Sequence, residues 1–524
     1  MQLALSFVTL LGSLILSLSY AETAEALPTR RDAGIVTLPL KRIHQARDDI
    51  HPQVLLQQHI NRSLKRHARM TGRSQPRARE LKANLHKRLE STETQVFARN
   101  QKRFNRHGVT KAAASSKVNE AKVGKAKGAQ GKGRVQGGQG GQGGAGAAGN
   151  AGAAGNAGAN VNEGGPGISP LDVEAATSGG LTDANAPTDS NSLGLDIEAN
   201  DVGYVATIQM GTPPRDFKIL MDSGSADLWV GAEDCQSSGG GGCGNHTFLG
   251  SNSSSSFVDT GKPFSVTYGT GEVSGDIVTD NINVAGLALD QHTFGVATVE
   301  SVDFSSDSVP FDGLMGLAQS TLSEQQTATP VESLAENNLI SQAITSFKIS
   351  RLADQKNDGE ITFGGLDQTK FDPNTLVTFD NVNQEGFWEG AMSVSSNGQD
   401  LGLEGRTAIL DTGTTLIVAP ESDAAAVHQT IPGAQSDGQG GFTIPCSTNT
   451  SIALTFGGQS FAIDPRDLLF SPVDPNNLEG DCVSGISSGN IGGATEWLVG
   501  DVFLKNAYFS TNVNTNQISL AELV

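Results

Sequence analysis

From about residue 200 to the C-terminus, short apolar runs alternate with turn residues. Val, Ile, Phe and Thr fill the runs, and Gly, Asn, Asp and Ser separate them. This texture is typical of short strands joined by tight turns, so it predicts an all-β body. Helical stretches in the body are few, and 330–338 is one of them. The predicted strands include 204–210, 216–221, 264–268, 360–363 and 517–520.

The residues before the body follow another pattern. Residues 22–130 are polar and basic. Two sets of apolar residues within them recur at helical spacing, namely Leu56, Ile60 and Leu64 and then Leu81, Leu85 and Leu89. Residues 131–167 consist mostly of Gly, Ala, Gln and Asn, a composition that cannot bury a core. Together with the acidic, turn-rich residues that follow, they predict a flexible linker over 131–199.

An apolar run opens the chain. Residues 3–18 are too few to span a bilayer securely, and Ser19, Tyr20 and Ala21 resemble a small-residue cleavage site. We therefore expect a secretory signal peptide over 1–21, the alternative being a buried N-terminal helix. No other segment is apolar enough to span a membrane, so we expect a soluble, secreted, extracellular product. Candidate N-glycosylation sites in such a product are Asn61, Asn245, Asn252 and Asn449.

The cysteines fit an oxidising compartment. The chain has four, which allow three pairings, at positions Cys235, Cys243, Cys446 and Cys482. We expect Cys235–Cys243 and Cys446–Cys482, because each loop then stays within one half of the body. A metal site is the rival interpretation, but the chain has no C-x-x-C and no clustered histidines, so we expect no metal.

Charge divides the chain sharply. Residues 1–134 carry a formal +17, whereas residues 200–524 carry a formal −30. Such asymmetry indicates that the two parts attract each other. The basic run 111–134 could bind nucleic acid, but it lacks interleaved aromatic residues and would lie in a secreted precursor. We expect no nucleic-acid partner.

Two stretches of the body nearly repeat each other. Residues 219–225 read Ile-Leu-Met-Asp-Ser-Gly-Ser and residues 408–414 read Ala-Ile-Leu-Asp-Thr-Gly-Thr, with the aspartates at 222 and 411. An apolar pair and a glycine follow each aspartate at a similar distance. They are Leu314, Met315 and Gly316, with the glycine 94 residues after Asp222, and Leu498, Val499 and Gly500, with the glycine 89 residues after Asp411. The spacing predicts a duplicated body that brings one aspartate from each half to a cleft between lobes. A third Asp-Thr-Gly, at Asp259, lacks both accompanying signals and is interpreted as an ordinary turn.

The residues that follow each aspartate suit a pair of carboxylates, and they are Ser223, Gly224 and Ser225 in the first half and Thr412, Gly413 and Thr414 in the second. The glycines let backbone N–H groups approach the carboxylates. The hydroxyls of Ser225 and Thr414 can donate to the outer carboxylate oxygens, and those of Ser223 and Thr412 can reach across to the opposite turn. Two carboxylates held close together share one proton over an acidic range. The ionised one can then activate a water molecule while the protonated one polarises a carbonyl.

With these motifs, residues 200–524 resemble a pepsin-type aspartic endopeptidase. Residues 266–271, Val-Thr-Tyr-Gly-Thr-Gly, are similar to the family's flap, and 311–317, Phe-Asp-Gly-Leu-Met-Gly-Leu, to a second signature. The resemblance implies that Tyr268, Gly269 and Thr270 belong to the flap and that the Trp229 indole bonds to the tyrosine. It also implies that the pocket for the residue before the scissile bond is lined by Leu220, Tyr268, Phe311 and Leu314.

The resemblance further implies a bilobal fold, a monomer, polypeptide substrates and no cofactor. Residues 34–41 resemble the start of the family's prosegment. We therefore expect a signal peptide (1–21), a basic prosegment (22–130) bound to the acidic body, a linker (131–199), an N-terminal lobe (200–385) and a C-terminal lobe (386–524). The expected function is an acid-acting endopeptidase made as a zymogen, activated either by itself or by another protease. The alternatives are a catalytically silent pepsin-like peptide-binding protein and a polyanion-binding protein.

Overall fold

The computed structural model describes most of the body and parts of the segment before it. The described residues are 203–268, 271–307, 309–354, 356–489 and 495–524, preceded by 36–39, 41–42, 52–70, 76–77, 79, 81–85, 87–88, 167–170, 172–173, 181–182 and 197–198. Contacts divide the chain into two units, residues 1–90 with 166–524 and residues 91–165. Every described residue belongs to the first unit. None of the described helices is both long and apolar enough to cross a bilayer.

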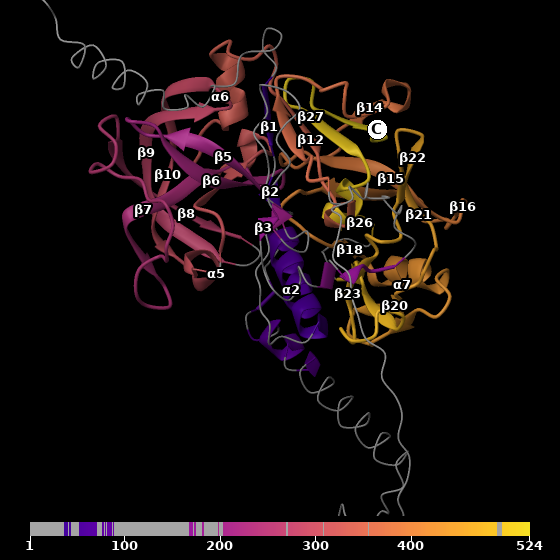
Figure 1. The fold of residues 1–524 in the computed structure, drawn as a ribbon. Helices are drawn as coiled ribbons and strands as arrows, with labels where there is room; N and C mark the ends of the chain where they lie inside the picture. The colour runs from indigo at the N-terminus through magenta and orange to yellow at the C-terminus, as the bar shows by residue number, and fades with distance from the viewer. Residues whose placement is uncertain are drawn as a thin grey trace, which may run out of the picture. The chain divides into compact units, whose positions relative to one another are not determined.

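Strands dominate the described unit, as the sequence predicts (Figure 1). The largest sheet has ten strands in the order β3 (Leu181–Thr182), β4 (Ile197–Glu198), β2 (Lys41–Arg42), β5 (Tyr204–Met210), β6 (Arg215–Asp222), β11 (Gly313–Gly316), β7 (Leu228–Ser237), β10 (Leu287–Glu300), β9 (Glu272–Val284) and β8 (Val258–Thr267).

A six-stranded sheet takes its strands from distant parts of the chain. Its order is β1 (Val36–Pro39), β13 (Glu360–Phe363), β12 (Ile344–Lys348), β27 (Tyr508–Asn512), β28 (Gln517–Ala521) and β14 (Val377–Asp380). Strands from both sides of the predicted lobe boundary at residue 385 therefore share this sheet, and the boundary stays a prediction.

Two further sheets form the second half. An eight-stranded sheet contains β22 (Gln459–Ile463), β21 (Ile452–Phe456), β15 (Glu389–Ser396), β17 (Arg406–Leu410), β26 (Glu496–Val499), β18 (Ile417–Ala419) and β25 (Ile486–Ser488), with β16 (Gln399–Asp400) paired to β15. A four-stranded sheet follows the order β19 (Gln435–Ser436), β20 (Phe442–Pro445), β24 (Asp481–Ser484) and β23 (Leu469–Pro472).

Within the described residues, the helices are short apart from one. The described helices are α2 (Pro52–Met70), α5 (Val302–Ser305), α6 (Pro330–Glu336), α7 (Glu421–Gln429) and α8 (Asp501–Leu504), with 3-10 turns η2 (Ser320–Leu322), η3 (Leu352–Asp354) and η4 (Pro373–Thr375). Helix α2 confirms the helical spacing of its apolar residues, and Leu56 and Ile60 are buried in the main core. Of the second set, Leu81 is buried in a partly helical stretch, and Leu89 lies outside the described residues.

Several predicted elements agree closely with the structure. Strands β5 and β13 coincide with predicted strands, and β6 extends a prediction by one residue at each end. Helix α6 ends two residues earlier than predicted, because Asn338 adopts a left-handed conformation with φ of 56°. Asp259 lies in β8 at a register shift, where its Oδ1 accepts the Gly261 N–H at 2.7 Å. The interpretation of Asp259 as an ordinary turn residue is therefore right only in part, because the turn-like contact belongs to an irregularity within strand β8.

The same three-stranded unit occurs in each half. Strand β11 runs parallel to β6 and antiparallel to β7, and β26 runs parallel to β17 and antiparallel to β18. The two recurring glycines, Gly316 and Gly500, are required by this packing. A Cβ at Gly316 would lie 2.4 Å from the Ala226 nitrogen, and one at Gly500 would lie 1.9 Å from the Thr414 oxygen. The predicted duplication is therefore present, and its glycines leave room for the two aspartate turns.

Candidate active site

Asp222 is the last residue of β6 and is fully buried. Its carboxylate is held from two sides within its own turn. The Gly224 N–H donates to Oδ1 at 2.9 Å, and the Ser225 hydroxyl donates to Oδ2 at 2.6 Å. Both contacts need the short turn that the Asp-Ser-Gly-Ser sequence provides, and together they fix the plane of the carboxylate.

Asp411 follows β17 and is also fully buried. The Gly413 N–H donates to its Oδ1 at 2.9 Å, and the Thr414 hydroxyl donates to its Oδ2 at 2.6 Å. The two aspartates thus receive the same two hydrogen bonds at the same distances, which the repeated residue types predict.

Reciprocal hydrogen bonds join the two turns. The Ser223 N–H donates to Thr412 Oγ1, and the Thr412 N–H donates to Ser223 Oγ, both at 2.9 Å. Each hydroxyl also donates to a carbonyl of the opposite strand, Ser223 to Leu410 at 3.0 Å and Thr412 to Met221 at 2.9 Å. Because these two residues directly follow the aspartates, the four bonds bring the two turns together from positions 189 residues apart.

An aromatic cluster lies in the first half of the body. The Trp229 indole N–H donates to the Tyr268 hydroxyl at 2.7 Å, and both side chains are buried. Phe311 and Leu314 are buried in the same cluster, and Leu220 packs against it half-buried. The structure therefore brings together the predicted lining residues that it describes, whereas Gly269 and Thr270 lie outside the described residues.

Sequence reasoning missed Phe304 in this cluster. Its ring meets those of Trp229 and Tyr268 edge-on, with centroids 5.3 Å and 5.5 Å away. It also contacts Phe311 at 6.2 Å. Phe304 lies in the one-turn helix α5, which is too short to show a periodic pattern. Only its place after an apolar strand could have singled it out.

Asp227 is a second residue that the sequence does not reveal. It lies two residues before Trp229, is buried, and accepts hydrogen bonds from the Ser323 hydroxyl (2.8 Å) and the Gln325 N–H (3.0 Å). Burial raises the pKa of this carboxyl, and the hydrogen bonds oppose the rise. Asp227 thus ties the loop after η2 to the chain segment between the Asp222 turn and β7. In the sequence, the signal that could have singled out Asp227 is its position directly before the apolar residues 228–230.

In the second half, Asp423 organises a comparable buried network. Arg406 binds both of its carboxylate oxygens, at 2.7 Å and 2.9 Å, and the Trp497 indole N–H donates to it at 3.0 Å. These hydrogen bonds from Arg406 and Trp497 lower the pKa of Asp423 against the opposing effect of burial. The network links α7 to β17 and β26, the strand pair that carries the Asp411 turn.

Both predicted disulfides are present. Cys235–Cys243 and Cys446–Cys482 have Cα–Cα distances of 5.6 Å and 5.0 Å. Glu300 lies beside the first pair, and among the described residues these three form the one group with the spacing of metal ligands. Because both sulfur atoms are bonded to each other, they are not thiolate ligands, and the group is no metal site.

Two further kinds of sequence motif lie outside the aspartate turns and the aromatic cluster, namely a serine motif and the candidate glycosylation sites. Residues 485–489 read Gly-Ile-Ser-Ser-Gly and match the Gly-X-Ser-X-Gly pattern of a serine-hydrolase nucleophile elbow. The serine of this pattern, Ser487, is buried in β25 rather than at a strand-to-helix turn, so it is no nucleophile elbow. Among the glycosylation candidates, Asn245, Asn252 and Asn449 are exposed. Asn61 is half-buried in α2, and its amide donates to the Leu81 carbonyl at 3.1 Å.

A basic residue of the N-terminal segment contacts the second half of the body. Arg88 is fully buried and pairs with Asp437 next to β19. It also donates to the Gln57 side chain of α2 at 3.0 Å and to the Gln439 carbonyl at 3.3 Å. The partner of Arg88 is thus an acidic residue outside the two aspartate turns.

Comparisons with known proteins agree with this geometry. The profile of the family described as eukaryotic aspartyl protease matches residues 203–523. The chain is 36% identical over 340 residues to a probable aspartic-type endopeptidase CTSD of Trichophyton verrucosum, covering 64% of either chain. It is 34% identical to the aspartic-type endopeptidase ctsD of Aspergillus fumigatus (64% of this chain, 69% of that one) and 32% identical to rhizopuspepsin of Rhizopus chinensis (67% and 84%). The match to the Trichophyton protein thus spans less than two thirds of that relative.

Proposed function

Because the chain belongs to the eukaryotic aspartyl protease family, we propose that it is an aspartic endopeptidase that hydrolyses peptide bonds at acidic pH. Its catalytic residues are Asp222 and Asp411. The observation that carries the proposal is the pair of matching aspartate turns, which reciprocal hydrogen bonds between Ser223 and Thr412 hold together.

The proposed reaction uses one shared proton. One aspartate is ionised and takes a proton from a bound water, whose oxygen attacks the substrate carbonyl carbon. The other is protonated and donates to the carbonyl oxygen, which becomes a hydroxyl in the tetrahedral intermediate. That intermediate then collapses: the C–N bond breaks, its hydroxyl proton returns to one carboxylate, and the leaving nitrogen is protonated by the other. The hydrogen bonds within each turn keep both carboxylates oriented without reorganisation, which favours this chemistry.

The aromatic cluster supports a substrate site beside the aspartates. The hydrogen bond from Trp229 would hold the Tyr268 ring in place at the end of the β8–β9 hairpin, which we propose folds over the bound peptide. The apolar side chains of Leu220, Phe311 and Leu314 favour a bulky hydrophobic residue before the scissile bond.

Substituting one aspartate tests this proposal. We expect Asp222→Asn to lower kcat on a denatured protein substrate by about a thousandfold or more, since it removes one of the two acid–base groups. Asp259→Asn makes the same substitution in the third Asp-Thr-Gly and should keep full activity. Activity is measured from about pH 3 to 7, the range in which carboxylates titrate. Equal activity in Asp222→Asn and wild type would refute the mechanism, and wild type that binds peptides without cleaving them would favour a catalytically silent binding protein.

We further propose that the protein is secreted as an inactive precursor whose basic segment stays bound to the acidic body. The formal charges of +17 and −30 support such an attraction, and the Arg88–Asp437 pair is one local instance. Acid protonates carboxylates of the body and weakens the attraction. Purified precursor should therefore become shorter and active at about pH 3–4, near the ordinary carboxyl pKa values. Precursor that stays intact and inactive there would contradict self-activation and leave processing by another protease.

A further inference from the structure

A loop from far along the chain holds the segment between the Asp222 turn and β7. Residues 323–329 form this loop, which joins η2 to α6. The Asp227 carboxylate accepts three hydrogen bonds from it. The Ser323 hydroxyl donates to Oδ1 at 2.8 Å, the Gln325 N–H donates to Oδ1 at 3.0 Å, and the Glu324 N–H donates to Oδ2 at 3.2 Å. Because Asp227 is buried, these bonds are shielded from water and are stronger than they would be at the surface.

The two carbonyls just before Trp229 are also held. The Gln325 Nε2 donates to the Leu228 carbonyl at 2.9 Å, and the Gly316 N–H donates to the Asp227 carbonyl at 2.9 Å. Leu228 is the first residue of β7 and Trp229 is the second. The loop, together with β11, therefore fixes the position from which the Trp229 side chain projects.

Ser323 gives the loop its shape as well as its attachment. Its hydroxyl accepts the Thr327 N–H at 3.1 Å while it donates to Asp227. The Gln326 N–H donates to the Ser323 carbonyl at 3.1 Å, and Gln326 adopts a left-handed conformation with φ of 57°. A hydroxyl both donates and accepts, so this one group closes the loop and ties it to Asp227.

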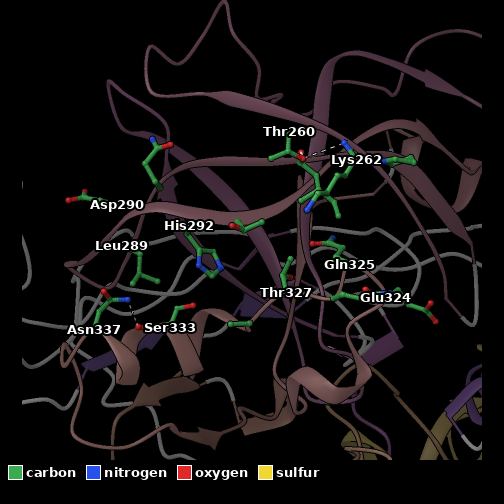
Figure 2. Close-up of a pocket in the computed structure, with 16 residues that line it drawn as sticks. Thr260, Lys262, Leu289, Asp290, His292, Glu324, Gln325, Thr327, Ser333 and Asn337 are labelled. Atoms are coloured by element: carbon green, nitrogen blue, oxygen red, sulfur yellow. Dashed lines mark hydrogen bonds between the residues drawn. The ribbon is translucent and has the colours of Figure 1, made fainter.

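Another side of the loop borders open space. Residues 324–328 line a cavity of about 630 Å³, together with residues of β8, β10 and α6 (Figure 2). Neither Asp227 nor Leu228 belongs to that lining. Atoms that face a cavity lack packing partners there, so the hydrogen bonds to Asp227 and Leu228 carry more of the task of positioning the loop.

The Trp229 indole passes this position on to the β8–β9 hairpin. Its N–H donates to the Tyr268 hydroxyl at 2.7 Å, and Tyr268 directly follows β8. A hydrogen bond weakens steeply when its geometry is distorted, so a displaced indole would release the hydroxyl. The contacts of Asp227 and the tyrosine are thus linked through one residue of β7.

The Asp222 turn depends less on the loop, although Asp227 lies only five residues after Asp222. The Asp222 carboxylate is held by donors of its own turn, and that turn exchanges hydrogen bonds with Thr412. None of these donors and acceptors belongs to the loop. A shift of Asp227 should therefore move Trp229 more than it moves the Asp222 carboxylate.

We propose that Asp227 is a positioning residue for substrate binding. Through the 323–329 loop it sets the start of β7, which holds the Trp229 indole and so places the Tyr268 hydroxyl beside the bound peptide. Asp227 acts as a hydrogen-bond acceptor. Because an amide oxygen can accept both bonds made to Oδ1, the negative charge is not required. The kinetic part of this inference rests on the proposed endopeptidase function.

Substituting Asp227 in the full-length protein tests the proposal. Asp227→Ala removes the acceptor of all three bonds, so KM for a peptide with a bulky hydrophobic residue before the scissile bond should rise about tenfold. The kcat should stay within about threefold of wild type, because the hairpin binds the substrate and the transition state alike. Asp227→Asn keeps an oxygen for Ser323 and Gln325 and should keep KM within about threefold of wild type. All proteins receive the same acid incubation, and kcat is expressed per processed chain.

A double-mutant cycle locates the effect in the tyrosine hydroxyl. Tyr268→Phe lacks the acceptor of the Trp229 N–H. In that background Asp227→Ala should change KM less than about twofold, because the contact through which Asp227 acts is already gone.

Asp280→Ala is the matched control for this cycle. Asp280 is a buried aspartate of the same half, and it accepts hydrogen bonds from the Ser254 hydroxyl at 3.0 Å and the Asn281 N–H at 2.8 Å. Neither donor belongs to the 323–329 loop. Any effect of Asp280→Ala on KM should therefore be the same factor with and without the Tyr268 hydroxyl.

The indole N–H signal of Trp229 reports its position without any catalysis. In NMR spectra of isotope-labelled protein, Asp227→Ala should shift this signal and speed its exchange with solvent, whereas Asp280→Ala should leave it unchanged. Trp229→Phe identifies the signal. Thermal unfolding shows which variants fold. If Asp227→Ala does not fold, Ser323→Ala removes one of the three bonds and should give the same changes at a smaller size.

Three outcomes would overturn the inference. The first is that the Trp229 indole signal is unchanged in every folded alanine variant of Asp227 or Ser323. The second is that Asp227→Ala raises KM equally with and without the Tyr268 hydroxyl. The third is that it lowers kcat and leaves KM unchanged, which would place the effect in the Asp222 turn. A wild-type protein that cleaves no peptide would instead refute the proposed function, and the indole signal would still test the contact.

Discussion

At the scale of single residues, the most demanding position is the small hydroxyl residue after each aspartate. Ser223 both accepts the Thr412 N–H and donates to the Leu410 carbonyl, and all of these groups are buried. The repeated residue types predict this exchange from sequence, because a hydroxyl can bridge a donor and an acceptor where a larger polar group would not fit. Serine at 223 opposite threonine at 412 shows that the hydroxyl is the shared requirement.

Removing the Ser223 hydroxyl should lower the free energy of unfolding. Ser223→Ala leaves the Thr412 N–H and the Leu410 carbonyl buried without this partner, so we expect a loss of about 2–4 kcal/mol in the free energy of unfolding. Ser223→Thr restores the hydroxyl and should remain within about 1 kcal/mol of wild type. Urea unfolding of the three proteins measures both differences. An alanine variant as stable as wild type would mean that the bonds joining the two turns add no net stability.

The buried carboxyl of Glu300 predicts how the stability of the fold depends on pH. It is 2% exposed beside the Cys235–Cys243 disulfide, and burial, with a smaller effect of the Asp312 charge, raises its pKa to about 7. Because the folded-state pKa exceeds the unfolded value of 4.5, stability from the protonated group is complete below about pH 4.5 and is lost as pH rises through 7. The loss approaches about 3 kcal/mol for one group.

Glu300→Gln should flatten this dependence, because the amide does not ionise. Between pH 4.5 and 7 the variant should lose less unfolding free energy than wild type, by an amount corresponding to one proton. Glu404→Gln, at an exposed position, serves as the control and should follow wild type. Parallel curves for all three proteins would show that Glu300 is ionised in the fold at mild acidity.

At the scale of elements, burial decides what the sequence can predict. Strand β6, and β5 from Ala206 onward, alternate buried and more exposed residues, and their apolar positions reveal them. The first six residues of β8 are all exposed, so their sequence carries no alternation, and pairing with β9 imposes the strand. The prediction for β8 accordingly begins at Phe264, where burial begins.

Helix α6 shows a local signal that sequence and structure share. Thr329 caps it by accepting the Glu332 N–H at 3.3 Å, and the Glu332 carboxylate accepts the Thr329 N–H at 2.9 Å. Thr329→Ala should lower the free energy of unfolding by about 1 kcal/mol, whereas Thr329→Ser should keep most of the cap. Chemical denaturation can resolve this difference. A serine variant as destabilised as the alanine variant would attribute the effect to the lost methyl group instead.

At the scale of the whole molecule, the duplication and the aspartate pair could be predicted because they repeat in sequence. The aromatic cluster could be predicted only in part, since Phe304 lies in a one-turn helix without periodicity. The buried networks of Asp227 and Asp423 could not be predicted, because each depends on partners distant in sequence. Arg88 was equally hidden, because it is one of many basic residues of the N-terminal segment.

The contact between Arg88 and Asp437 can be tested by substituting Asp437. Asp437→Asn removes the charge of Asp437 from the ion pair with the buried Arg88 guanidinium, and breaking a buried pair typically costs about 3–5 kcal/mol. We therefore expect faster hydrogen exchange in α2, whose Gln57 shares the same guanidinium. Lys87→Ala changes the exposed neighbour and should leave exchange in α2 unchanged. Unchanged exchange in the Asp437 variant would show that other contacts suffice to hold the helix.

Because β1 pairs with β13, cutting the backbone after the N-terminal segment is not the same as releasing that segment from the body. Residues 36–39 complete one edge of a sheet that otherwise consists of strands from residue 344 onward. A single break in the backbone between residues 88 and 203 would therefore yield two pieces still joined by interstrand hydrogen bonds and by a buried ion pair. Such a nicked protein would give two bands under denaturing electrophoresis yet elute as one particle, until some later change in conditions let the smaller piece diffuse away.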